Sequence, residues 1–337
     1  MTPLVRTSHL RKVFKAGSLL RRQSVTAVDD VSFDIKAGET LGLVSESGSG
    51  KSTLGRMVIG LTAPSAGYVR VGAHEVTALG GARKALWREA QMVFQDPYSS
   101  LDPRMTVHDA LAEPLRNFGI ARGAEAGTRI RAALDACGLP AGAAGRLPQE
   151  FSGGQRQRIG IARALIVQPR LVVADEPVSA LDVSVQAQIV NLMQDLKAQL
   201  GLTYLFISHD LAVVRHVADR VAVLYAGRVV EIGRADALYA APLYPYTQLL
   251  LRSVPIPHTK AEAARLSRRA PAPAEAGPAS GGCRFRARCP IAQVPICAEV
   301  DPVASGRDGT HLAACHFAGH LSPVTLASAS APEGSRQ

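Results

Sequence analysis

Aromatic residues are scarce in this chain of 337 residues: they make up 5% of it, with a single Trp, which argues against an aromatic-rich binding surface. No apolar run approaches the roughly 20 residues that a bilayer-spanning helix needs, so we expect no membrane span. The first residues carry early charges and no apolar stretch followed by a cleavage site, so we expect no secretory signal. With five cysteines and no signal, we expect a reducing compartment and no disulfide scaffold.

The chain is rich in apolar and basic residues. Hydrophobic residues make up 47% and charged residues 20%, which allows a sizeable buried core and excludes wholesale disorder. The formal net charge of +10 suits a polyphosphate ligand, an anionic membrane surface or nucleic acid, but it selects none of them. The length suits one large domain with an appendage, or two modest domains.

Short apolar runs alternate with helical patterns through most of the chain. Unbroken apolar strands separated by helices are typical of a mostly parallel sheet covered on both faces, so we predict an α/β fold. Residues from about 106 to 166 are rich in helix formers and predict a helical insertion, in which Cys137 should be a buried apolar filler. The apolar runs are 41–44, 171–174, 203–207 and 221–225. The predicted helix faces are Leu54, Met57, Val58 and Leu61, and Val185, Ile189, Leu192, Leu196 and Leu200.

A Gly- and Ser-rich loop follows the first apolar run and precedes a helical pattern. Gly48 and Gly50 let the backbone wrap closely, so that successive N–H groups and the helix N-terminus can bind one phosphate. Lys51 would reach the β- and γ-phosphates, and Ser52 would place its hydroxyl on Mg²⁺. The usual pattern begins with Gly, and Ser45 would be strained there if the position needs a positive φ. The nucleotide-binding candidates of this loop are Ser45, Gly48, Ser49, Gly50, Lys51, Ser52 and Thr53.

Three polar residues follow apolar runs directly. Asp175 and Glu176 end the second run, at the carboxyl edge where open α/β sheets bind ligands. Asp175 would hold Mg²⁺, and Glu176 would orient and deprotonate the attacking water. His209 follows the third run and, as a neutral imidazole, would hydrogen-bond the γ-phosphate and that water. Taken alone, the two acids would be read as a helix cap and the histidine as structural. The phosphate loop elsewhere in the sequence favours the catalytic interpretation of all three.

Residues 151–158, Phe-Ser-Gly-Gly-Gln-Arg-Gln-Arg, are similar to the signature motif of the ATP-binding-cassette (ABC) ATPases, which usually begins with Leu. Gln95 resembles the Q-loop glutamine of that family, residues 179–182 resemble its D-loop, and His209 resembles its switch histidine. Phe14 is a candidate for the aromatic residue that stacks on adenine. The resemblance covers about residues 5–255.

This resemblance implies an α/β P-loop NTPase (ABC ATPase) core with an antiparallel β subdomain and a helical subdomain at about 96–166, all within a nucleotide-binding domain at 1–255. It implies that two such domains sandwich two ATP molecules, each between the phosphate loop of one subunit and the signature motif of the other. Gln95 would pass the state of the γ-phosphate to the helical subdomain, which docks on the membrane subunits. The implied site residues are Glu176, His209 and Gln95 for catalysis, Ser52, Gln95 and Asp175 for Mg²⁺, and Phe14, Ser152, Gly153, Gly154, Gln155 and Asp182 for the nucleotide.

Two further segments, 94–107 and 243–248, are similar to the second ATPase of oligopeptide and dipeptide transporters. The tail motif of that family usually reads His-Pro-Tyr, and here Tyr244 stands in for the His. The resemblance implies an ATPase subunit of a peptide importer, peripheral on the cytoplasmic face of the membrane. The implied partners are a distinct second ATPase in a heterodimer, two permease subunits and an extracytoplasmic solute-binding protein. We expect no nucleic acid partner.

Four cysteines gather near the end of the chain, at Cys283, Cys289, Cys297 and Cys315, with a spacing unlike the paired motifs of zinc ribbons. Four thiolates suit a [4Fe–4S] cluster. Peptide-transporter ATPases carry a similar C-terminal cluster, and that resemblance favours iron–sulfur; zinc and free thiols stay as alternatives. We expect a structural role, because so small a module buries little core of its own. The expected C-terminal extension with this cluster spans 256–320, with a linker at 270–282, and a disordered tail follows at 321–337.

Two other functions remain open. One is an ABC importer ATPase for nickel or another small solute. The other belongs to a different class, a soluble ABC ATPase acting on nucleic acid. Repair-type members of that class insert a long coiled coil between the phosphate loop and the signature motif, and the 100 positions from Ser52 to Ser152 leave no room for one.

Overall fold

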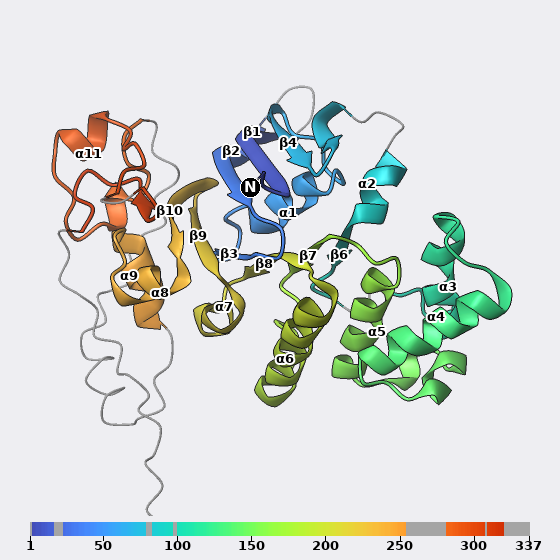
Figure 1. Ribbon diagram of the computed structural model, residues 1–337. Coiled ribbons are helices and arrows are strands. Elements are labelled where there is room, and N and C mark those ends of the chain that lie inside the picture. The colour runs from blue at the N-terminus through green and yellow to red at the C-terminus, as the bar shows by residue number, and fades with distance from the viewer. Residues whose placement is uncertain are drawn as a thin grey trace, which may run out of the picture. The chain divides into compact units, whose positions relative to one another are not determined.

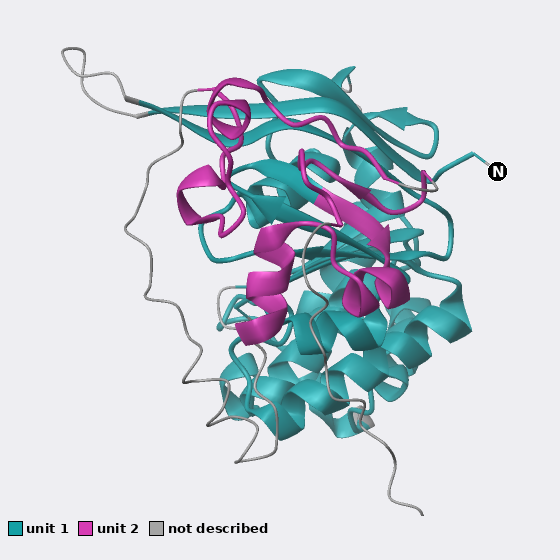
Figure 2. Ribbon diagram, turned by 90° about the vertical axis from the view of Figure 1, so that its left-hand side faces the viewer, with its two compact units in different colours: residues 1–230 teal, residues 231–337 magenta. Residues whose placement is uncertain are grey.

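The computed structural model describes residues 2–16, 23–78, 83–96, 100–253, 281–306 and 309–319. The expected tail at 321–337 and the expected linker as far as residue 280 lie outside these residues. The chain forms two compact units, Met1–Val230 and Glu231–Gln337, which Figure 2 colours separately.

The first unit is built on a parallel sheet. Neighbouring strands follow the order β9-β3-β8-β7-β6, and each pair is parallel. Strands β3, β7 and β8 are buried along their whole length, as the unbroken apolar runs predict. Helices α1 and α7 pack on this sheet (Figure 1), so the predicted α/β fold is confirmed. The elements are β3 (Thr40–Val44), α1 (Lys51–Val58), β6 (Ala90–Val93), β7 (Leu171–Asp175), β8 (Thr203–Ser208), α7 (Leu211–Val217) and β9 (Arg220–Tyr225).

A second sheet in this unit is antiparallel, as the family resemblance implies. Its strand order is β2-β1-β4-β5, and β1 pairs with both β2 and β4. Side chains from these strands, such as Val5, Leu10 and Ile35, are fully buried. The elements are β1 (Val5–Ala16), β2 (Gln23–Ile35), β4 (Ala66–Val71), β5 (His74–Glu75), η1 (Val76–Ala78) and α2 (Arg83–Glu89).

The segment from 106 to 166 consists of helices joined by short turns, with no strand among its residues. Thr106 caps α3 by accepting a hydrogen bond from the Asp109 N–H, and α3, α4 and α5 pack on one another. Cys137 is 1% exposed, which confirms it as a buried filler, and burial raises the pKa of its thiol to about 12. The elements are α3 (Val107–Asn117), α4 (Gly123–Ala136), η3 (Ala141–Gly145), η4 (Pro148–Glu150) and α5 (Gly153–Leu165). Beyond this segment, α6 (Val183–Leu200) lies between β7 and β8 in the chain.

Two predicted helix faces were partly wrong. Helix α1 ends at Val58, so Leu61 lies beyond it and is 47% exposed. In α6 the last predicted position, Leu200, is 50% exposed. The residues that α6 buries are Ile189, Val190, Met193 and Leu196. The other predicted positions outside this set, Val185 and Leu192, are half-buried.

The second unit begins within β10 (Arg228–Arg234), which pairs with the short strand β11 (Leu312–Ala313) through Glu231 and Ala313. Tyr244, Tyr246 and Phe285 are buried in this unit. Its other elements are α8 (Ala235–Ala240), α9 (Pro245–Ser253), η5 (Arg286–Arg288) and α11 (Ile296–Glu299).

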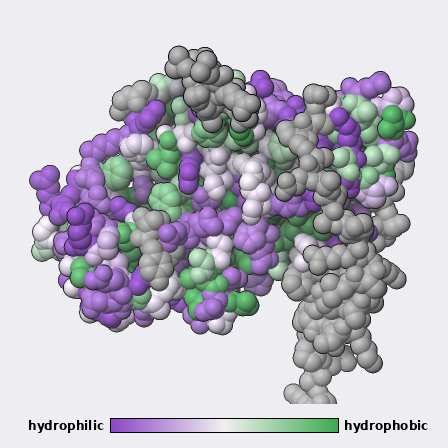
Figure 3. Space-filling model, turned by 180° about the vertical axis from the view of Figure 1, so that it is seen from behind, coloured by the Kyte–Doolittle hydropathy of each residue, from purple (hydrophilic) through white to green (hydrophobic). Residues whose placement is uncertain are grey.

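Among the described residues, every helix falls short of the length and hydropathy that a membrane-spanning segment requires. The face of the molecule in Figure 3 mixes many polar side chains with scattered apolar ones among the described residues.

Candidate active site

The loop between β3 and α1 places positive φ angles at its glycines. Gly50, the residue before α1, has φ +104°, and Gly48 has φ +78°. A Cβ atom on Gly50 would lie 2.1 Å from the carbonyl oxygen of Ala27, so only glycine fits there. Ser45 is not among the described non-glycine residues with a positive φ. The condition for strain, a positive φ at Ser45, is therefore not met.

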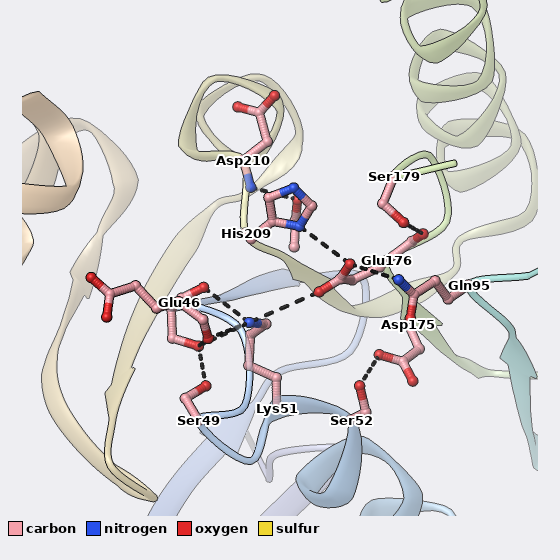
Figure 4. A network of polar contacts seen from close by, with 12 residues as sticks. Glu46, Ser49, Lys51, Ser52, Gln95, Asp175, Glu176, Ser179, His209 and Asp210 are labelled. Carbon is pink, nitrogen blue, oxygen red and sulfur yellow. Dashed lines mark hydrogen bonds and ion pairs between the residues drawn. The ribbon is translucent and has the colours of Figure 1, made fainter. Parts of the chain in front are cut away.

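The ammonium group of Lys51 is held inside this loop (Figure 4). Its Nζ donates hydrogen bonds to the carbonyl oxygens of Ser45 at 2.9 Å and Glu46 at 3.0 Å, and to the hydroxyl of Ser45 at 3.0 Å. The hydroxyl of Ser45 also contacts that of Ser49. The Lys51 side chain is 4% exposed, and this burial lowers its pKa although Glu176 and Asp175 oppose the shift. The loop thus holds a buried cation at its centre.

A hydroxyl group and a carboxylate meet beside the lysine. The hydroxyl of Ser52, in the first turn of α1, donates to Asp175 Oδ1 at 2.8 Å. Asp175 ends β7 and is 2% exposed, and its burial raises the pKa of the carboxyl while the bond from Ser52 acts against the rise. A carboxylate and a hydroxyl are hard oxygen donors of the kind that Mg²⁺ binds.

Glu176 follows β7 with φ +47° and lies between residues from two neighbouring strand ends. Its Oε2 accepts a hydrogen bond from Gln95 Nε2 at 3.1 Å and lies 3.2 Å from His209 Nδ1. Its Oε1 lies 3.9 Å from the Nζ of Lys51. Because β6, β7 and β8 are parallel neighbours, the residues that follow them meet at one edge of the sheet (Figure 4).

Three other residues predicted to bind the nucleotide are described here by their neighbours in the chain. Ser152 caps α5, where its hydroxyl accepts from the Gln155 N–H at 3.3 Å and the Gln155 side chain accepts from the Ser152 N–H at 3.1 Å. Asp182 is the residue before α6. Phe14, on β1, is 43% exposed with the Lys12 ammonium 5.0 Å from its ring centre. No described contact joins these residues to the phosphate loop within the single chain.

One supporting contact of the loop escaped the sequence reasoning. The N–H of Gly227, in the turn after β9, donates to the carbonyl oxygen of Ser49 at 3.1 Å. Gly227 has φ +81°, and a Cβ atom there would lie 2.9 Å from the Ala27 oxygen. In the sequence, Ala226 and Gly227 signal only a turn between two strands. No sequence pattern around Gly227 indicates that this turn contacts the phosphate loop.

The C-terminal cysteines share one small cavity in the second unit. Cys283 and Cys297 are buried, Cys289 and Cys315 are half-buried, and all four line the cavity together with aromatic side chains. Burial raises the pKa of the Cys315 thiol to about 11. Across the described residues, however, no group of three or more His, Cys, Asp or Glu side chains is placed to hold a metal ion. The expected metal centre is therefore not supported by the described geometry.

The two histidines near the cysteines are engaged elsewhere. His311 Nε2 lies 2.7 Å from Glu231 Oε1, and His316 Nε2 lies 3.0 Å from the carbonyl oxygen of Val300.

Comparison with known proteins identifies the class. The family model described as ABC transporter matches residues 28–179. The oligopeptide transport ATP-binding protein AppF of Bacillus subtilis is 48% identical over 297 residues, which cover 87% of this chain and 90% of AppF. A protein of Brucella ovis named for peptide import is 48% identical over 315 residues, which cover 93% of this chain and 98% of that protein. The chain therefore belongs to the ABC transporter family of ATP-binding proteins.

More particular matches agree with the finer resemblance. The model for the C-terminal region of oligopeptide/dipeptide transporters matches residues 230–297. A dimeric structure of an ATP-binding cassette in a post-hydrolysis state, bound to ADP and Pi, is 30% identical with a TM-score of 0.61. The match covers 68% of this chain and 98% of that chain. These findings confirm the predicted family and its ATPase fold.

Proposed function

We propose that this protein is the ATP-hydrolysing subunit of an ABC importer and powers the uptake of di- or oligopeptides across the cytoplasmic membrane. The observation that carries the proposal is the meeting, at one edge of the sheet, of a buried lysine, a Ser–Asp pair and a glutamate between an amide and an imidazole. The names of two relatives, which refer to oligopeptide transport and to peptide import, support the cargo.

The phosphate loop and α1 would bind the nucleotide. The Nζ of Lys51, now held by three loop oxygens, would exchange some of them for β- and γ-phosphate oxygens. The N–H groups that follow Gly48 and the N-terminus of α1 would bind the same phosphates. Ser49 and Thr53 would complete this cradle. The exposed ring of Phe14 would stack on the adenine.

Ser52 and Asp175 would hold Mg²⁺, because they already bring a hydroxyl and a carboxylate together at 2.8 Å. Gln95 would add its side-chain oxygen. A bound Mg²⁺ would neutralise the charge that grows on the phosphates during transfer.

Glu176 would act as the general base. Its carboxylate would take the proton of the attacking water while the contacts to Gln95 Nε2 and His209 Nδ1 keep it aimed. Because Gln95 and His209 come from the strands on either side of β7, the base sits where the γ-phosphate and the attacking water would meet.

A second subunit would complete the site. Ser152, Gly153, Gly154 and Gln155 lie at the N-terminus of the 13-residue helix α5, where backbone N–H groups such as those of Gly153 and Gly154 suit a γ-phosphate from a facing subunit. Asp182 would lie at the same junction. The similar cassette structure is dimeric, which supports this arrangement. We propose that the nucleotide-binding domain spans 1–255 and that the partner ATPase is a distinct chain, so that the pair is a heterodimer.

The remaining partners follow from the role in import. Two permease subunits would receive the helical subdomain, and an extracytoplasmic solute-binding protein would deliver the peptide. The protein would then be peripheral on the cytoplasmic face of the membrane.

We further propose that the four C-terminal cysteines bind a [4Fe–4S] cluster. The chemistry of the donor set supports this proposal, since four thiols line one cavity and soft thiolates suit iron–sulfur clusters. In such a cluster each thiolate binds a different iron, whereas four zinc ligands share one ion at about 2.3 Å from each sulfur. Metal content distinguishes the two assignments. Anaerobic protein with stoichiometric zinc and no iron would overturn this assignment.

The test of the function is transport by the whole complex. We would reconstitute the protein with its partner ATPase, permeases and binding protein in proteoliposomes and measure uptake of labelled di- and oligopeptides. Uptake should require ATP on the side of this subunit and should disappear with Lys51→Ala. The matched control is Lys36→Ala, an exposed lysine outside the site. Transport of nickel without peptide would contradict the cargo, and ATP hydrolysis without any transport would contradict the import role.

A further inference from the structure

Tyr244 lines the cysteine cavity through a polar group. Its hydroxyl lies 3.5 Å from the Sγ of Cys283, within hydrogen-bonding distance for sulfur. The side chain is 2% exposed, so water does not compete for this contact.

Backbone hydrogen bonds and ring packing both hold Tyr244 in position. The N–H of Tyr244 donates to Glu231 Oε2 at 3.0 Å, and the N–H of Leu243 donates to Oε1 of the same carboxylate at 2.7 Å. The Glu231 side chain is fully buried and is also paired with His311. At the other end, the ring of Tyr244 packs on Phe285 with 5.9 Å between ring centres. Backbone anchoring and ring packing together direct the hydroxyl at the cavity.

The chemistry of the contact depends on what Cys283 binds. A neutral thiol is a weak acceptor, so a phenol gains little from it. A thiolate bound to metal keeps negative charge on sulfur, and a hydrogen bond to an ionised acceptor is about twice as strong as a neutral one. A buried donor at this point is therefore most effective when Cys283 is a metal ligand.

We propose that Tyr244 is a positioning residue for the cysteine-bound cluster: its hydroxyl donates to Cys283 Sγ, holds that ligand in place and raises the reduction potential of the cluster. The inference rests on the [4Fe–4S] part of the proposed function. Adding an electron increases the negative charge on the thiolates, and a hydrogen bond to sulfur stabilises the more negative state. Without the hydroxyl, reduction of the cluster becomes harder, and the Cys283 thiolate dissociates from the cluster more readily.

The experiment compares full-length wild-type protein with Tyr244→Phe, each purified anaerobically. Iron content, the midpoint potential from a dithionite titration followed by electron paramagnetic resonance, and the rate of iron loss to a chelator are measured. Tyr244→Phe should shift the potential to a more negative value and speed iron loss severalfold. The matched control is Tyr246→Phe, which loses the same hydroxyl from a buried ring that also packs on Phe285, at 5.6 Å, but does not line the cavity. It should behave as the wild type does.

Each outcome decides a different claim. A fully loaded Tyr244→Phe protein with the wild-type potential and rate of iron loss would overturn the role of Tyr244 and leave the cluster standing. Wild-type protein without iron would overturn the cluster and this inference together, whereas ATP-driven peptide uptake tests the transport function separately. If Tyr244→Phe does not fold, Tyr244→His decides, because imidazole keeps a donor: a wild-type potential supports the role, and a lowered one overturns it.

Discussion

Replacing Gly50 by Ala tests whether the phosphate loop has the geometry described here. The new methyl group would lie 2.1 Å from the carbonyl oxygen of Ala27, a backbone atom of β2 that has no rotamer to move away. The residue would also keep φ near +104°, which L-residues avoid. Relief requires the loop or β2 to shift, and the N–H groups that would bind phosphate then lose their alignment.

The size of the effect follows from comparison with Gly48→Ala. Gly48 also has a positive φ, but a Cβ atom there meets nothing within 4 Å. Both variants therefore carry the conformational cost of about 1–2 kcal/mol for a non-glycine residue in this region. Only Gly50→Ala adds the steric cost, which for an overpacked site is about 1–3 kcal/mol. At 1.4 kcal/mol for each factor of ten, Gly50→Ala should bind ATP about 5- to 150-fold more weakly than Gly48→Ala.

Equilibrium titration of the two variants and the wild type with a fluorescent ATP analogue measures this difference directly. Thermal unfolding followed by circular dichroism, run in parallel, shows whether each variant is folded. If folded Gly50→Ala and Gly48→Ala bind ATP with equal affinity, the close approach of Gly50 to Ala27 does not shape the nucleotide site, and the argument fails.

Three other variants address the base, a buried thiol and a buried carboxylate. Glu176→Gln should lower ATPase activity of the assembled complex by about 100-fold or more, the usual share of a general base, and should retain an ATP-bound dimer on gel filtration; unchanged turnover would remove Glu176 from that role. Cys137, with its pKa raised by burial to about 12, should be alkylated by iodoacetamide at pH 8 about a thousandfold more slowly in the folded than in the urea-unfolded protein, as mass spectrometry can measure, and equal rates would contradict the burial. Glu231→Ala should destabilise the second unit by about 1–3 kcal/mol for each buried donor left unsatisfied, because it removes the acceptor of two backbone N–H groups and the partner of His311 Nε2. The exposed control Asp236→Ala should lower the stability far less in the same thermal unfolding assay, because exposed ion pairs contribute little, and equal losses would refute the role of burial.

The core of the candidate site could be predicted because its residues follow strands whose pattern is local. Asp175 and His209 come directly after apolar runs, and parallel strands bring their carboxyl ends to one edge of the sheet. The sequence does not contain the strand order, which the fold supplies by placing Gln95, after β6, on the other side of Glu176. The roles of these residues remain predictions until the variants are measured.

Contacts between segments far apart in the sequence could not be predicted. The N–H of Gly227 supports the carbonyl oxygen of Ser49 from 178 positions away, and the only local signal is a turn. The carboxylate of Glu231 holds the Leu243–Tyr244 backbone, although its position in an apolar strand pattern would suggest a solvent-facing charge. Both depend on which surfaces the fold brings together, and a single sequence does not encode that as a pattern.

Ser45 departs from the phosphate-loop motif, and the backbone φ angles of the loop decide whether that departure causes strain. The motif has Gly at this position, and a Ser there would be strained if φ were positive. In this loop the positive φ angles fall at Gly48 and Gly50, so Ser45 incurs no such strain. Its hydroxyl instead accepts one of the three hydrogen bonds from Lys51 that hold the ammonium group at the centre of the loop. The serine is therefore compatible with a working phosphate loop, because the residues that need the freedom of glycine are the two that have it.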